Sequence, residues 1–335
     1  MFTILKKYPD KSLLCLFDKF SSLEKMQQYD GDPHIHKDLA SKVYASEYAM
    51  LLHSFRSSPI DLCRLTSLRS QTASIWLSNV PYNHHTFTNR HFAILIKQFL
   101  NFQILQDTVD VCPLCKLNIH PQGAISHSQT CSKLKGYRNI RHTVVKRLLI
   151  KIMEERAKRT AENEPLVRAS FPLKPARAGE RISADTIKHR ADILFCNYDA
   201  LNLPTLADIT IRHPTEDVIR MYKPAGHNIT DLLKYRGLAA KSGYVEKMTF
   251  YSSRYNIRQG GILPISIDTY GYLHDEPYKF LRKYVNNRAS FRSVIEGLSY
   301  ASKMSAGKSI LKYLDLIATT SLSASKARRR AAVAF

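Results

Sequence analysis

Two short apolar runs in the middle of the chain predict a pair of neighbouring strands. Residues 190–195 and 206–211 are mostly apolar, and the polar segment between them has the composition of a turn. The first run contains Asp192 and the second contains Asp208. Because aspartate is a poor strand former, an acid inside each strand calls for an explanation other than strand stability.

The pattern that follows predicts the rest of an α/β unit. A helix is expected at residues 229–240, and it carries Lys234, with Lys241 just beyond it. Further strands are expected at residues 244–251 and 262–268. Four strands with helices on both sides predict a mixed sheet flanked by helices.

Apolar residues recur at helical spacing elsewhere in the chain. They predict helices at residues 36–53, 89–105 and 142–159, and the chain is again helical from residue 277 to about residue 318. We therefore expect a helical region before the sheet and further helices after it.

The charge of the chain adds a candidate partner. Fifty Lys and Arg residues stand against twenty-eight Asp and Glu, which gives a net charge of +22. An excess of this size predicts a polyanionic partner, and nucleic acid is the expected one. A membrane surface is the alternative, but the sequence contains no long apolar span and no basic amphipathic anchor at either end. The first residues lack a signal-peptide pattern, so secretion is not expected.

Part of this charge lies on the predicted helix at residues 142–159. Lys146, Arg147 and Lys151 occupy its surface beside an apolar stripe. They form either a solvated face or a phosphate-contacting surface, and the sequence alone favours neither. Lys241 is a further candidate for nucleic-acid binding.

Three cysteines and a histidine have the spacing of a zinc site. Cys112, Cys115, His127 and Cys131 form the pattern C-x₂-C-x₁₁-H-x₃-C. The first pair can wrap one tetrahedral ion through its thiolates, and the second pair closes a structural site with no open position. His120 is an alternative to His127 as the third ligand. Six cysteines, three of them in this cluster, indicate reduced thiols and metal rather than disulfides.

A divalent cation would explain the two strand aspartates. Mg²⁺ takes oxygen ligands and keeps part of its water shell, so two converging carboxylates suit it. A nearby lysine could then orient or deprotonate a metal-bound water. The alternative is that both aspartates lie at strand edges and face solvent.

The order of these features resembles the restriction-like endonuclease of site-specific non-LTR retrotransposons. That enzyme is a PD-(D/E)XK nuclease in which the lysine has moved to the helix after the second strand. Asp192 resembles the acid of the family's Arg-Pro-Asp, with alanine in place of proline, and Asp208 resembles the second acid. Lys234, in a Lys-Tyr pair, resembles the migrated lysine, and Arg141 with His142 resembles an Arg-His pair that follows the family's CCHC zinc knuckle.

The resemblance implies an endonuclease that nicks target DNA with Mg²⁺ or Mn²⁺. Asp192, Asp208 and the backbone carbonyl of Ile209 would hold the ion, Lys234 would activate water, and Arg141 would contact nucleic acid beside the zinc knuckle. A reverse transcriptase on a separate chain is a further expected partner. The short basic cluster near the C-terminus can serve as a nuclear-import signal or a phosphate contact, and a nuclear location is expected from it. Two other hypotheses stay open. The chain is a nucleic-acid-binding protein with a decayed nuclease core, or it is an inactive module that folds only against an absent polymerase.

The expected fold class is therefore α/β, and five regions are expected along the chain. They are a helical region (1–73), a Trp-containing segment with the zinc knuckle (74–141), a basic helix and linker (142–180), a restriction-endonuclease-like core with a mixed sheet (181–285), and C-terminal helices with a basic tail (286–335).

Overall fold

The computed structural model describes residues 35–78, 87–100, 111–119, 123–156, 161–175, 183–196, 204–222, 229–285 and 287–333. The chain divides into two compact units, of which one comprises Met1–Leu62 and Pro224–Lys234 and the other Cys63–Lys223 and Tyr235–Phe335. The sheet belongs to the second unit. Among the described helices, none combines the length and the apolar character that a membrane span requires.

Four strands form one mixed sheet in the order β1-β2-β3-β4. β1 (Ala161–Asn163) pairs antiparallel with β2 (Ile193–Phe195), and β2 pairs antiparallel with β3 (Thr205–Arg212). β3 pairs parallel with β4 (Ile262–Asp268). The predicted hairpin and the predicted strand at residues 262–268 are therefore confirmed. β4 is buried throughout, as expected for a strand that helices cover on both faces.

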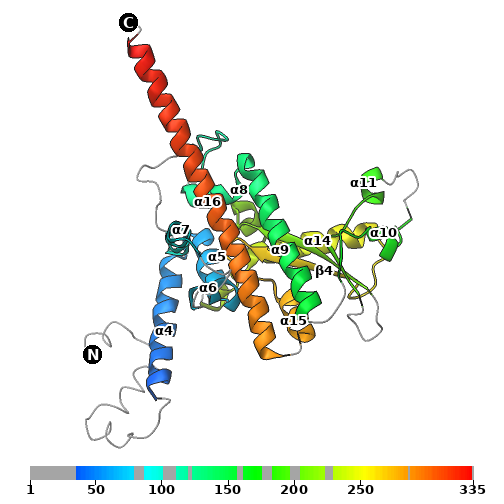
Figure 1. The fold of residues 1–335 in the computed structure, drawn as a ribbon. Coiled ribbons are helices and arrows are strands. Elements are labelled where there is room, and N and C mark those ends of the chain that lie inside the picture. Colours follow the sequence, from blue (N-terminus) through cyan, green and yellow to red (C-terminus); the bar gives the residue numbers. More distant parts are fainter. Residues whose placement is uncertain are drawn as a thin grey trace, which may run out of the picture. The chain divides into compact units, whose positions relative to one another are not determined.

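Helices cover both faces of this sheet (Figure 1). On one face α9 (Lys135–Arg156) and α16 (Arg288–Val333) lie side by side, and they share a core with the sheet residues Ala207, Ile209 and Ile265. On the other face α14 (Leu238–Arg254) packs through Tyr251 against Leu206 and Ile262. Successive residues of β3 therefore point to α9 and to α14 in turn, which turns Asp208 towards α14.

A glycine brings α14 close to the sheet. A Cβ atom at Gly243 would lie 2.7 Å from Ser266 Oγ and 2.8 Å from Thr210 Cγ2, so a larger residue would push the helix away from β3 and β4. This close approach lets side chains one and two turns further along α14 reach Asp208.

The remaining helices surround these layers or belong to the first unit. They are α4 (Ile35–Ser54), α5 (Pro59–Leu68), α6 (Gln71–Ser78), α7 (Asn89–Leu100), α8 (Gly123–Thr130), the 3-10 helix η1 (Ser132–Leu134), α10 (Val167–Ser170), α11 (Ala184–Ile187), α12 (Glu216–Tyr222), α13 (Ile229–Leu233) and α15 (Asp275–Tyr284). The predicted helix at residues 36–53 is confirmed as α4. The predicted helix at residues 142–159 is confirmed as α9 as far as Arg156, and its last residues lie outside the described ranges. The prediction at residues 89–105 is confirmed as far as Leu100, and its last residues lie outside the described ranges.

One predicted strand is wrong. Residues 244–251 lie inside α14, and the fourth strand of the sheet is β1 instead. The segment is rich in strand-forming Tyr, Val, Thr and Phe, but Ala240, Gly243 and Tyr251 are buried at helical spacing against the sheet. Tertiary packing therefore overrides the local preference.

The predicted helix at residues 229–240 is also wrong in its extent. It is two helices, α13 and α14, because the chain turns between them at Gly237, which has a left-handed backbone (φ +65°). A Cβ atom at Gly237 would meet the ring of Tyr272, so the turn requires glycine. Lys234 and Lys241 consequently do not share one helix face.

Candidate functional site

The first acid, Asp192, lies directly before β2 and opposite β3. Its backbone N–H donates to the carbonyl of Ala207 (3.1 Å), which extends the β2–β3 ladder by one residue. Its Oδ2 atom accepts from the backbone N–H of Ile209 (2.7 Å) and lies 3.0 Å from Nε2 of His142 on α9. The carboxylate is thus fixed by both the sheet and a helix.

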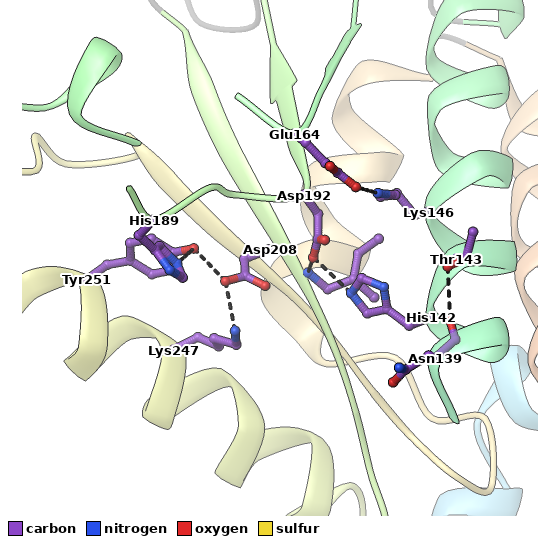
Figure 2. Close-up of polar contacts among 11 residues, drawn as sticks. Asn139, His142, Thr143, Lys146, Glu164, His189, Asp192, Asp208, Lys247 and Tyr251 are labelled. Atoms are coloured by element: carbon purple, nitrogen blue, oxygen red, sulfur yellow. Dashed lines mark hydrogen bonds and ion pairs between the residues drawn. The ribbon is translucent and has the colours of Figure 1, made fainter. Parts of the chain in front are cut away.

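The second acid, Asp208, is buried in the middle of β3 and held by two side chains of α14. Lys247 Nζ lies 2.8 Å from Asp208 Oδ2, and the Tyr251 hydroxyl donates to the same oxygen. Figure 2 shows Asp192 and Asp208 facing each other, with Lys247 and Tyr251 on one side and His142 on the other. We call Asp192 and Asp208 the acid pair.

A histidine extends the contacts of Asp208. His189 Nε2 lies 3.1 Å from the Tyr251 hydroxyl oxygen. Because Tyr251 gives its single hydroxyl proton to Asp208, its oxygen must accept from His189, which assigns the proton of His189 to Nε2. His189 therefore donates to Tyr251 and Tyr251 donates to Asp208, and these two hydrogen bonds fix the orientation of the buried carboxylate.

The two acids have opposite shifts in pKa. Burial raises the pKa of Asp208, Lys247 opposes that rise, and the negative charge of Asp192 adds to it. Burial would also raise the pKa of Asp192, but the hydrogen bond and charge of His142 and the Ile209 N–H outweigh it and hold the pKa below its usual value. The hydrogen bond to Asp192 raises the pKa of His142 against the effect of burial. Opposite shifts are expected when two carboxylates lie close together, because their like charges repel and one of them then holds its proton more strongly.

A third carboxylate lies beside the acid pair. Glu164 accepts from Lys146 Nζ (2.6 Å), and its backbone N–H donates to the carbonyl of Asp192 (3.0 Å). Its backbone is left-handed (φ +54°), a conformation that non-glycine residues adopt at a cost and that is common at functional sites. Arg190 Nη1 donates to the Glu164 carbonyl (2.6 Å) and stabilises this turn.

A hollow of about 460 Å³ opens between α9 and β1 beside Glu164. Thr143, Arg147 and Lys151 line it from successive turns of α9. Arg147 and Lys151 are exposed, whereas Lys146 is nearly buried against Glu164. The cationic face of α9 therefore begins next to the acid pair and runs away from it.

The other predicted contacts lie elsewhere. Lys234 follows α13 in the first unit, and its ammonium pairs with Asp231 (2.6 Å). Lys241 is exposed on α14, 5.8 Å from the ring of Tyr222. Arg141 is buried and donates to Gln129 (2.7 Å), so its guanidinium is not available to a phosphate on the surface.

Lys247, Tyr251 and His189 are site residues that were not predicted from the sequence. Lys247 and Tyr251 are one helical turn apart, a spacing that would have suggested a shared face had the segment been predicted as a helix. His189 precedes Asp192 by three residues and had no such signal. All three residues can be recognised as part of the site only once α14 is known to pack against β3.

The second candidate site is the cysteine cluster, which comprises Cys112, Cys115, His127 and Cys131. Their ligand atoms lie within 4.8 Å of one another, and Cys115 Sγ lies 3.2 Å from His127 Nε2. The edges of a tetrahedron of zinc ligands measure about 3.5–3.8 Å, from Zn–S and Zn–N bonds of about 2.3 and 2.05 Å. The four residues therefore form a possible metal-binding group that is compatible with zinc.

Local structure brings these four ligands together. Cys112 and Cys115 lie in a tight turn closed by the Lys116 N–H to the Cys112 carbonyl (2.9 Å), and Lys116 has a left-handed backbone (φ +64°). His127 lies on α8, and Cys131 follows that helix directly. The alternative ligand, His120, lies outside the described residues.

The cluster also contacts the long C-terminal helix. The Tyr313 hydroxyl of α16 donates to Cys112 Sγ (3.4 Å), and Tyr313 packs in one core with Ile119 and Leu134. Without an ion, burial raises the pKa of Cys131 to about 12, so its thiol keeps its proton. A bound divalent cation would take the place of that proton.

No protein-family model matches the chain, and no curated protein matches its sequence.

Proposed function

We propose that the chain is a metal-dependent endonuclease that nicks DNA. The observation that carries this proposal is the acid pair, two largely buried carboxylates of which one lies on β3 and the other directly before the neighbouring strand β2, with Lys247 in contact with Asp208. The resemblance to the restriction-like endonucleases of non-LTR retrotransposons supports the same function. The sheet with helices on both faces is compatible with the restriction-like fold of those enzymes.

The carboxylate oxygens of the acid pair are ligands that suit Mg²⁺ or Mn²⁺. The contacts of Asp192 and Asp208 with His142, Ile209, Lys247 and Tyr251 all use the Oδ2 atoms, so the Oδ1 atoms are the candidate ligands. Mg²⁺ commonly binds one or two carboxylates together with water and substrate phosphate, so two oxygens are sufficient. Such an ion would supply Lewis-acid stabilisation of charge on the scissile phosphate and a more acidic bound water.

The surrounding residues have separate roles in this proposal. Lys247 takes the role that the resemblance gave to Lys234, because its ammonium lies beside Asp208, where it can orient or deprotonate the attacking water. His142 and Tyr251 are positioning residues, since each fixes one carboxylate and neither needs to touch DNA.

The cationic face of α9 provides the contact with the DNA backbone. Arg147 and Lys151 line the hollow beside Glu164, so phosphates next to the scissile one would lie along α9. The net charge of +22 suits such a partner. In this proposal zinc in the cysteine cluster is structural. The nuclear location and the reverse-transcriptase partner stay predictions from the sequence.

Nicking of supercoiled plasmid with Mg²⁺ tests the proposal. Wild-type protein should nick, and Asp208→Asn should abolish nicking while it retains DNA binding, because the substitution keeps the shape of the side chain and removes its charge. If the wild type binds DNA and does not nick it with Mg²⁺ or Mn²⁺, the chain is a nucleic-acid-binding protein without nuclease activity, a role that its basic surface would also serve.

A further inference from the structure

A second hollow lies away from the acid pair, where α15 ends and α16 begins. Its volume is about 580 Å³, and it is lined by Arg282 from α15, by Arg288 and Arg292 from α16, and by the aromatic residues Tyr278 and Phe291. No residue of the acid pair, its positioning residues or the cysteine cluster lines it. We call it the arginine hollow.

The positive charge of the arginine hollow is largely uncompensated. Arg292 pairs with Glu296 (2.8 Å), whereas Arg282 and Arg288 have no carboxylate partner among the described residues. The two guanidinium groups without such a partner repel each other across the concavity, which favours an anion between them. A guanidinium presents a planar fork of donors that matches the oxygens of a phosphate, so the missing partner is expected to be a phosphate.

Two aromatic rings accompany these cations. Tyr278 and Phe291 meet edge to face, with ring centroids 5.3 Å apart at an angle of 84°. The Tyr278 hydroxyl donates to Gln71 Oε1 (3.3 Å), which holds the ring in place. Both rings are half-buried, so part of each is accessible from the hollow. Aromatic rings next to arginines are the usual means by which proteins hold unpaired bases together with their phosphates.

The size of the hollow suits an unpaired nucleotide segment. A concavity of about 580 Å³ falls within the range of small-ligand pockets, about 300–1,000 Å³. One or two nucleotides fit into such a space. A duplex keeps its bases stacked inside, so it would present its backbone to the hollow and no free base to the rings.

We propose that the arginine hollow binds an unpaired nucleotide segment, with Arg282 and Arg288 on its phosphates and Phe291 against a base. This site is separate from the cleavage chemistry at the acid pair. A nicking enzyme with such a site would hold a displaced or single-stranded portion of its substrate while the acid pair acts on the duplex.

Binding of fluorescein-labelled hexathymidylate to the full-length, zinc-loaded protein without Mg²⁺ tests this proposal. Arg282→Gln with Arg288→Gln should weaken binding at least tenfold and reduce the slope of log affinity against log salt by about 1.4, or about 0.7 for each phosphate that the variant no longer neutralises. Phe291→Leu should weaken binding about tenfold, since stacking on one base contributes about 1–3 kcal/mol. A 12-base-pair duplex should lose little affinity in either variant.

Lys279→Gln with Lys283→Gln is the matched control, because both residues are exposed cations of the same helix, α15, that do not line the hollow. Thermal unfolding of each variant checks its folding, and Arg288→Gln alone, a single surface change, serves if the double variant does not fold. Equal losses in the variant with Lys279→Gln and Lys283→Gln would overturn the proposal, because they would mean a diffuse charge effect. So would equal losses for duplex and single strand, or displacement of the oligonucleotide by inorganic phosphate as effective as displacement by thymidine 5′-monophosphate. Because nicking is measured separately, an inactive acid pair would leave this result unchanged.

Discussion

The cysteine cluster and the acid pair differ in how far apart their residues lie in the sequence. The four ligands of the cluster fall between Cys112 and Cys131, and a turn and one short helix bring them together. The acid pair and its contacts come from α9, β2, β3 and α14, between His142 and Tyr251. The first site is therefore a local structure that a metal can complete, whereas the second exists only once the sheet and its helices have packed.

The two sites also differ in the chemistry of their ligands. The cluster offers four soft ligands and no open position, which is typical of structural zinc. The acid pair offers hard oxygens, and each carboxylate is already held by a cation or a hydrogen-bond donor of the protein. Loss of zinc should consequently change folding, and changes around the acid pair should change activity.

The largest effect is expected from removal of the zinc ligands. Cys112→Ser with Cys131→Ser should lose about one equivalent of zinc and unfold the segment around α8, because structural zinc contributes about 10–16 kcal/mol of apparent binding free energy to folding. Metal analysis and hydrogen exchange measure this, and exchange should rise around α8 and the Tyr313 region of α16 while β3 and β4 stay protected. Cys196→Ser is the control, since Cys196 lies outside the cluster. Full zinc content in the double variant would contradict the assignment.

The next effect distinguishes two lysines. Lys247→Met should lower the nicking rate by about 10²–10⁴-fold, the usual contribution of a positioned proton-transfer group, with little change in DNA binding. Lys234→Met should change nicking little, because its ammonium pairs with Asp231. Single-turnover nicking and a separate binding assay measure both variants. The opposite order of the two losses would restore the role that the sequence resemblance gave to Lys234.

A smaller effect is expected from the residues that position Asp208. Tyr251→Phe and His189→Gln should each raise the Mn²⁺ concentration needed for half-maximal nicking about 10–100-fold, as is usual for partners that orient a metal ligand. Raised Mn²⁺ concentration should restore much of the rate, whereas it should not rescue Asp208→Asn. A loss in Tyr251→Phe that Mn²⁺ leaves unchanged would mean that Tyr251 acts only in packing.

The smallest effect concerns the surface of α9. Arg147→Gln with Lys151→Gln should weaken duplex binding a few-fold and reduce its salt slope by about 1.8, or about 0.9 for each phosphate that the two side chains neutralise. Lys308→Gln, which removes an exposed cation of α16, gives the reference for a general decrease in charge. An unchanged salt slope would show that DNA follows another path across the protein.

The sequence predicted much of this structure where the signal is local. The β2–β3 hairpin, β4, α4 and α9 follow from apolar spacing, and the cysteine cluster follows from ligand spacing. The strand-forming residues of α14 led to the prediction of a strand in place of the helix that carries Lys247 and Tyr251, because local preference and tertiary packing disagree there. The contact of His142 with Asp192 spans 50 positions and depends on how α9 lies on the sheet, which no local pattern encodes.

The most direct test of the central claim is Mn²⁺ binding to the zinc-loaded protein, measured by electron paramagnetic resonance. The account predicts a Mn²⁺ site that is lost in both Asp192→Asn and Asp208→Asn and is retained in Lys234→Met and in the Cys196→Ser control. Mn²⁺ binding that is unchanged by both aspartate substitutions would contradict the claim that the acid pair holds the catalytic metal.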